Sequence, residues 1–300
     1  MRAILYKRFG GPEVLELVDV PDPHPSAGQV RVAVRAVGVN PIDWKMRSGM
    51  MGGDLPQTTG REAAGVVDAV GEGIEDVGPG DRVFGFVTGA GAAELAVLTD
   101  YAPIPASLDF AGAAALPVAV ETATRTLDLL GVGQDTILLI NGAAGAVGCS
   151  AVQLARLRGA RVIGTASPNN HEYLRSLGAE PTSYGDGLTD RVREIVPGGV
   201  DAALDAAGGG ALPALLELAG DPEGVVTIAD YAGAHETGVR FSGGMGTERA
   251  VHALRDVGPL IESGKFSLPV AETFPLEKIG DAHALSQDGH VRGKLVLLVG

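Results

Sequence analysis

The sequence predicts an α/β protein that combines a doubly wound parallel sheet with a second, β-rich domain. From about residue 119 to residue 264, apolar strand-like runs alternate with segments of helical periodicity, as they do in parallel sheets covered by helices. Residues 1–118 and 265–300 are instead rich in valine, proline and glycine. Short strands between glycine turns favour an antiparallel, barrel-like arrangement. We therefore expect residues 1–118 and 265–300 to form one domain and residues 119–264 the other.

Alternating apolar residues mark the strands of the β-rich domain. In residues 29–39, Val30, Val32 and Val34 lie on one face and Arg31 and Arg35 on the other, which is typical of a half-buried strand. Further strands are predicted at 65–70 and 81–87. The tail repeats this pattern, with strands at 268–274 and 293–299 around a helix at 276–287. We expect this tail to pair back onto the first domain.

A glycine turn follows the most apolar run of the chain. Residues 136–140 read TILLI and suit a strand buried on both faces. They are followed by NGAAGAVG, by a helical segment at 146–158 and by a second strand at 160–166. In this context one glycine makes the tight turn, one lets the backbone approach a pyrophosphate, and one lets the helix pack closely. The helix N-terminus offers N–H groups to the phosphates. The predicted cofactor-binding residues of this turn are Gly142, Ala143, Ala144, Gly145, Ala146, Val147 and Gly148.

The remaining elements of the second domain continue the same alternation. A helix is predicted at 171–177, a strand near 181–184, a helix at 190–196, a strand at 200–206, a further helix, a strand at 224–229 and a helix near 247–263. Ala229, at the end of its strand, joins the cofactor candidates. The segment 239–244 is the candidate edge strand, and an exposed edge invites pairing across a two-fold axis.

The end of the second strand bears on the choice of dinucleotide. NAD sites commonly place Asp or Glu there to accept a bond from the ribose 2′-OH. This strand instead leads into Ser167 and Asn170, which can donate to a 2′-phosphate. We therefore expect NADPH. Both side chains could also cap the next helix.

Composition and charge fit a cytoplasmic enzyme and exclude several other classes. The formal net charge of −14 argues against nucleic-acid binding. The single cysteine, Cys149, excludes an intrachain disulfide and a thiolate-rich zinc site, and we expect it to pack as a small apolar group. No run reaches membrane-spanning length, and the N-terminal segment does not resemble a signal peptide.

Several separated motifs resemble those of the zinc-independent medium-chain dehydrogenase/reductases, specifically the quinone oxidoreductase group that includes zeta-crystallin. They are GVNPIDWK at 38–45, GREAAGVV at 60–67, GDRV at 80–83, the turn at 142–148, TAS at 165–167 and GHVRGKLVL at 289–297. The resemblance implies a Rossmann domain and a GroES-like barrel. It also implies an NADPH-dependent reductase of quinones or activated enones, with its site in the cleft between the domains, and a homodimer.

The resemblance also suggests how hydride transfer proceeds. Zinc-dependent relatives carry a Cys ligand where this chain has Asn40 and a His where it has Arg61, and Glu62 alone cannot make a zinc site. No metal is therefore expected. Without a Lewis acid, acceptors that delocalise charge onto a conjugated oxygen are favoured. Simple alcohols are not.

The candidate site residues each have a structural alternative. Asn40 could donate to substrate or nicotinamide, or be a turn residue before a proline. Asp43 and Lys45 could supply a proton, or form a surface ion pair at a helix start. Thr122 matches the family's threonine near the nicotinamide, or starts a helix. Tyr184 matches an adenosine-side contact, or packs at a strand end. Water could also be the proton donor.

The sequence departs from the pattern of this family in two places, and it leaves two rival functions open. No Arg or Lys adjoins Ser167, and the nearest candidates for the 2′-phosphate are His171 and Arg175, so NADH could also serve. The first domain and the segment after Tyr231 look shortened, which could alter a substrate lid. The rivals are a 2-alkenal or enoyl reductase of the same family and a non-catalytic NADPH-binding protein with a redox-sensing or structural role.

Overall fold

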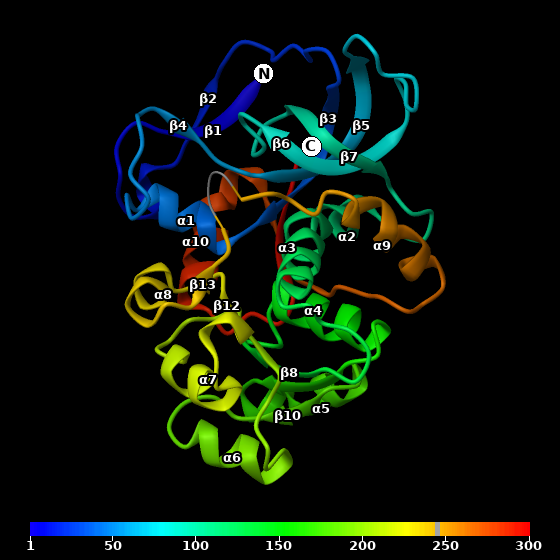
Figure 1. Cartoon of the computed structure of the whole chain (residues 1–300). Coiled ribbons are helices and arrows are strands. Elements are labelled where there is room, and N and C mark those ends of the chain that lie inside the picture. Colours follow the sequence, from blue (N-terminus) through cyan, green and yellow to red (C-terminus); the bar gives the residue numbers. More distant parts are fainter. Residues whose placement is uncertain (244–246) are drawn as a thin grey trace. The chain divides into compact units, whose positions relative to one another are not determined.

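The computed structural model describes residues 1–243 and 247–300, which divide into two compact units (Figure 1). One unit comprises Met1–Val118 and Val251–Gly300, and the other comprises Ala119–Ala250. The second boundary lies earlier than the expected residue 264, because helix α9 (Ala253–Glu262) packs on the first unit. The backbone N–H and hydroxyl of Ser107 both donate to Glu262 Oε1 at 3.1 Å. Arg255 pairs with Asp76 at 2.9 Å.

The first unit contains a sheet in the order β14-β15-β3-β5-β6-β7, in which β3 also pairs with β7 and so closes a barrel. The predicted half-buried strand is confirmed, since Val30, Val32 and Val34 of β3 are buried in the barrel core. The tail returns as expected, because β15 pairs antiparallel with β3. The strands are β3 (Val30–Val39), β5 (Glu62–Val70), β6 (Arg82–Thr88), β7 (Leu95–Pro103), β14 (Val270–Pro275) and β15 (Lys294–Leu298).

A small sheet and three helices complete this unit with α9. The sheet has the order β2-β1-β4. Helix α1 starts with Pro41 at its first position and carries Asp43 in its first turn and Arg47 in its last, which suits the helix dipole. The elements are β1 (Arg2–Tyr6), β2 (Glu16–Asp19), β4 (Gln57–Thr58), α1 (Pro41–Arg47), α2 (Phe110–Ala114), α10 (Ile279–Asp288) and the 3-10 turns Pro12–Val14 and Leu276–Lys278.

The second unit is the predicted parallel sheet, in the order β10-β9-β8-β11-β12-β13. Leu138 and Ile140 of β8 face the core shared with α3, α4 and α5, whereas Leu139 faces the core shared with α6 and α7. A strand buried on both faces therefore needs the continuous apolar run that the sequence shows. The strands are β8 (Ile137–Asn141), β9 (Arg161–Thr165), β10 (Glu180–Thr182), β11 (Ala202–Asp205), β12 (Val225–Thr227) and β13 (Arg240–Phe241).

Helices follow the strands of this unit in the doubly wound manner. They are α3 (Leu116–Leu129), α4 (Ala146–Leu157), α5 (His171–Ser176), α6 (Leu188–Ile195), α7 (Leu212–Ala219) and α8 (Tyr231–Thr237), with 3-10 turns at Pro168–Asn170 and Pro222–Gly224. The predicted edge strand is β13, and the last residue of that predicted segment, Gly244, lies outside the described residues. No helix in the described residues is long and apolar enough to cross a membrane.

Candidate active site

A buried polar cluster surrounds Asn40 at the start of α1. Lys294 Nζ lies 2.6 Å from both Asn40 Oδ1 and Glu62 Oε1, and Asn40 Nδ2 donates to Glu62 Oε1 at 2.6 Å. Glu62 Oε2 accepts the Val118 N–H at 2.7 Å. Asn40, Glu62 and Lys294 are at most 5% exposed. Because the ammonium can only donate, it fixes the carbonyl oxygen of the amide toward Lys294 and the amide nitrogen toward Glu62.

This cluster connects segments that sequence reasoning had not joined. The sequence predicts Asn40 as a site residue, but Glu62 enters that prediction only as a residual zinc ligand and Lys294 only as part of a family motif. The turn alternative for Asn40 is incomplete, since this residue is both the N-cap of α1 and a member of a buried cluster. A charged residue in an apolar strand was the available signal, because such a residue is rarely buried without a partner.

Asp43 is a buried carboxyl group next to this cluster. Its Oδ2 accepts the Asn40 backbone N–H at 2.8 Å. Asp43 is only 4% exposed. Burial raises the pKa of Asp43 to about 6, while the Asn40 N–H and the charge of Arg61 oppose this rise. The alternative of a surface ion pair is therefore wrong for Asp43. A carboxyl group with a pKa near neutrality is suited to proton transfer.

Lys45 and Asp43 lie in different surroundings. Lys45 is half-buried, and its Nζ lies 5.8 Å from the centroid of the Trp44 ring, as in a cation–π contact. Asp43 lines a pocket of about 390 Å³, and Lys45 is not among the residues that line it. Of the two predicted proton donors, Asp43 is thus the one that the structure places at a cavity.

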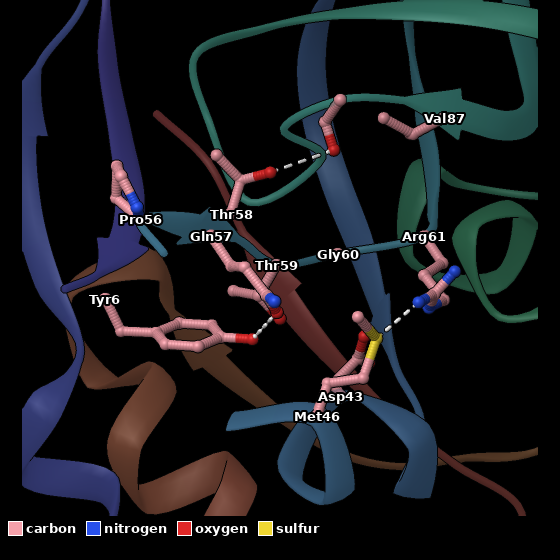
Figure 2. Close-up of a pocket in the computed structure, with 11 residues that line it drawn as sticks. Tyr6, Asp43, Met46, Pro56, Gln57, Thr58, Thr59, Gly60, Arg61 and Val87 are labelled. Carbon is pink, nitrogen blue, oxygen red and sulfur yellow. Dashed lines mark hydrogen bonds between the residues drawn. The ribbon is translucent and has the colours of Figure 1, made fainter. Parts of the chain in front are cut away.

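The pocket lies wholly within the first unit, between β4, α1 and the segment that leads into β5 (Figure 2). Tyr6 donates to Gln57 Oε1 at 2.5 Å, and Thr58 donates to the Gly89 carbonyl at 3.2 Å. Arg61 donates to the sulfur of Met46. The residues that line the pocket are Tyr6, Asp43, Met46, Pro56, Gln57, Thr58, Thr59, Gly60, Arg61, Val87 and Gly89.

The glycine turn of the second unit has the geometry of a phosphate-binding turn. Gly142 has φ +80°, and a Cβ at Gly148 would lie 2.2 Å from the Gly142 carbonyl, so these two glycines make the turn and allow close packing of α4. A Cβ at Gly145 would meet only the Gly142 carbonyl at 3.6 Å, which leaves the surrounding space open. Gly145 is the N-cap of α4, and no side chain of the described residues caps this helix. The first N–H groups of α4 therefore lack partners within the helix.

A chain of buried polar side chains fixes this turn from below, across the carboxyl ends of four strands. Asp205 Oδ1 accepts from Asn141 Nδ2 at 2.9 Å and from the Gly208 N–H at 2.7 Å, and Asp205 Oδ2 accepts the Thr227 hydroxyl at 2.7 Å. The Thr165 hydroxyl donates to Asn141 Oδ1 at 2.7 Å and accepts the Gly142 N–H at 3.1 Å. This network was not predicted from the sequence.

The segment after β9 leaves a hydroxyl group available. Asn170 Nδ2 donates to Ser167 Oγ at 3.1 Å, and neither side chain caps a helix. The capping alternative is therefore wrong for both residues. Because Ser167 Oγ accepts this bond, its own proton remains free to donate. His171 Nε2 contacts the Ala166 carbonyl at 3.2 Å, and Arg175 pairs with Glu172 at 3.3 Å.

The other predicted cofactor residues lie in different settings. Thr122 is in the second turn of α3 and 7% exposed, and its hydroxyl donates to Glu121 Oε2 at 3.2 Å, so the helix-start alternative is wrong. Tyr184 is 50% exposed after β10, so its ring is not packed at the strand end. The Ala229 N–H donates to Thr227 Oγ1 at 3.1 Å, which attaches the loop after β12 to the polar network. Cys149 is buried in α4.

The residues of the first unit show how the zinc-ligand positions of relatives are used here. In the described part of the chain, no group of three or more His, Cys, Asp or Glu could hold a metal ion. Both carboxylate oxygens of Glu62 already accept hydrogen bonds, from Asn40, Lys294 and the Val118 N–H.

Comparisons with known proteins match both units. Residues 26–123 match the alcohol dehydrogenase GroES-like domain, and residues 177–297 match the zinc-binding dehydrogenase family. The quinone oxidoreductase of Rattus norvegicus is 31% identical over 336 residues, covering 100% of this chain and 98% of that protein. The solved structure of the Coxiella burnetii quinone oxidoreductase superposes with a TM-score of 0.87 at 32% identity, covering 100% of this chain and 99% of that one.

Two further relatives carry other names. An NADPH-dependent alkenal/one oxidoreductase of Arabidopsis thaliana is 32% identical, covering 99% of this chain and 79% of that protein. The polyketide synthase protein NorB of Streptomyces orinoci is 37% identical, but the match spans only 14% of its length. The predicted family and the prediction of an enzyme are confirmed. This chain is an oxidoreductase of the medium-chain dehydrogenase/reductase family and belongs to its quinone oxidoreductase group.

Proposed function

We propose that this enzyme uses NADPH to reduce a quinone or an activated enone, without a metal ion. The observation that carries the proposal is the pairing of an open glycine turn with a strand end that has no carboxylate, at Gly142–Gly148 and Ser167. When bound, NADPH supplies the hydride. The names of the rat and Arabidopsis relatives support the two acceptor classes, quinone and alkenal or alkenone.

The second unit would hold the dinucleotide through its backbone and two polar side chains. The uncapped N–H groups at the start of α4 would bind the pyrophosphate, and the space around Gly145 allows close approach. The Ser167 hydroxyl and the Asn170 side-chain amide would donate hydrogen bonds to the 2′-phosphate. Thr122, Tyr184 and Ala229 remain predicted contacts along the rest of the cofactor.

The first unit would orient the acceptor and supply a proton. Asn40 Nδ2 uses one N–H for Glu62, which leaves the second for an acceptor oxygen or the carboxamide of the nicotinamide. Lys294 and Glu62 prevent the amide from rotating, so this donor keeps one direction. Asp43 would deliver the proton when protonated. Lys45 is the weaker candidate because it does not line the pocket. Without a metal, charge delocalisation in the acceptor lowers the barrier.

The activity is tested by following NADPH oxidation with benzoquinones, naphthoquinones and 2-alkenals, before and after exhaustive chelation. We expect turnover with one or more of these classes, no turnover of simple alcohols with NADP⁺, and no loss on chelation. Rapid alcohol oxidation, or loss of activity that zinc restores, would refute the metal-free mechanism. Cofactor binding without turnover of any acceptor would favour the non-catalytic role.

Cofactor preference is tested separately with Ser167→Asp. A carboxylate at this position would repel the 2′-phosphate and accept from the 2′-OH, so the preference should shift from NADPH to NADH. Calorimetric titration of both cofactors measures the ratio. Ser176→Asp, on the exposed end of α5, adds the same charge as a control. Equal affinities of the unmodified enzyme for the two cofactors would contradict the assignment.

We also propose a homodimer joined through β13. Among the described residues, this strand lies at the end of the sheet order and pairs only with β12, so its outer edge is available for a second copy. Light scattering at micromolar concentration should give about twice 30.5 kDa. A monomer mass would contradict this. The cytoplasmic location stays a prediction.

A further inference from the structure

Arg61 presents an uncommitted positive charge to the pocket of the first unit. Its side chain is exposed, and the one hydrogen bond that the described residues give it goes to the thioether of Met46. A thioether is a weak acceptor, so most of the five guanidinium N–H donors remain unused. Other arginines of this acidic chain pair with carboxylates, as Arg31 does with Asp68 at 3.0 Å.

The other groups in the pocket add one further donor. Thr59 is 6% exposed, and its hydroxyl has no hydrogen-bond partner among the described residues. Tyr6 and Thr58 already donate to Gln57 and the Gly89 carbonyl. Figure 2 shows Arg61 and Met46 on one side of the pocket and Tyr6 and Gln57 on the other.

Asp43 is the acid that lines the same pocket, and it offsets Arg61 only in part. Its Oδ2 accepts the Asn40 N–H, and no ion pair joins it to Arg61 in the described structure. Burial raises its pKa toward neutrality, so near pH 6 a substantial fraction of this carboxyl group is uncharged. Because no ion pair joins the two groups in the described structure, the Arg61 guanidinium keeps its N–H donors for a ligand.

We propose that Arg61 selects acceptors that carry a carboxylate beside their conjugated carbonyl group. A guanidinium binds a carboxylate through two parallel N–H···O bonds, which no other side chain of the pocket can match. The volume of about 390 Å³ suits a small acceptor. This inference rests on the proposed function for its redox step, but the anion site can be measured without turnover.

Matched acceptors test the selection. (E)-4-Oxo-2-pentenoate and 3-penten-2-one share the enone and differ in one carboxylate. In Arg61→Gln the KM of the acid should rise about tenfold while that of the neutral ketone changes less than about twofold. Arg61→Lys keeps the charge, so its KM for the acid should lie between those of the unmodified enzyme and Arg61→Gln. Arg35→Gln removes an exposed charge that does not line the pocket and should change neither KM. An equal effect of Arg61→Gln on both acceptors would overturn the selection.

A binding experiment separates this inference from the proposed function. 1-Naphthoate should bind the NADPH-loaded enzyme about tenfold more tightly than 1-naphthamide, and Arg61→Gln should abolish the difference. If none of the quinones, 2-alkenals and enones is reduced but naphthoate shows this preference, the proposed function fails and the anion site stands. If the two naphthalenes bind equally to the unmodified enzyme, the anion site is refuted, whatever the turnover.

Discussion

Replacing Asp43 with asparagine should stabilise the enzyme at neutral pH. Burial raises the pKa of this carboxyl group from 3.8 to about 6 in the folded state. Each pKa unit corresponds to about 1.36 kcal/mol, so ionising Asp43 costs the folded state about 3 kcal/mol relative to the unfolded chain. Because the folded-state pKa is raised, this contribution to stability is complete below pH 3.8 and is lost as the pH rises through about 6. Asparagine keeps the acceptor for the Asn40 N–H and carries no charge.

The effect can be followed by urea unfolding at a series of pH values. Trp44 is the only tryptophan and adjoins Asp43 in α1, so its fluorescence reports on the unfolding of this unit. The free energy of unfolding of Asp43→Asn should exceed that of the unmodified enzyme by up to about 3 kcal/mol at about pH 7.5. This difference should vanish near pH 4. Asp54→Asn, at an exposed position, should change little. A pH-independent difference, or a less stable variant at neutral pH, would refute the reasoning.

The same variant tests the proton-donor role. If Asp43 delivers the proton, Asp43→Asn should lower kcat about 10²-fold or more and remove the titration near pH 6 from the kcat profile. Unchanged kcat would assign the proton to water.

Three other substitutions follow from buried groups. Burial lowers the pKa of His283 from 6.5 to about 4, so its contribution to stability is complete above pH 6.5 and is lost as the pH falls toward 4. His283→Asn should remove about 3 kcal/mol of this loss of stability in acid, as measured by urea unfolding at two pH values. Lys294→Met leaves Glu62 buried and unpaired and should cost about 3–5 kcal/mol, most of it restored by adding Glu62→Gln; an uncorrected loss would contradict the pairing. Asp205→Asn should weaken NADPH binding about tenfold in a fluorescence titration, since an amide cannot accept from all its donors. Asp201→Asn, at the opposite end of β11, should not.

The local elements followed from the sequence because their signals are local. The apolar run of β8, the glycines at 142, 145 and 148 and the alternation of β3 each lie within one short segment, and each predicted its element. The strand end without a carboxylate likewise needed no structure. Backbone sterics and burial act on neighbouring residues, so a short stretch of sequence contains the information.

The connections between distant residues were decided by the tertiary structure. Lys294 and Asn40 are 254 positions apart, and Asn141 and Asp205 are 64 apart. No periodicity links such pairs, because the register of β15 on β3, and of β11 on β8, depends on the packing of the whole sheet. The sequence alone determined that Asn40 and the glycine turn are present and suited to their chemistry. Only the fold decided which buried charges hold them in place, since a buried charge is stable only where the chain brings its partner.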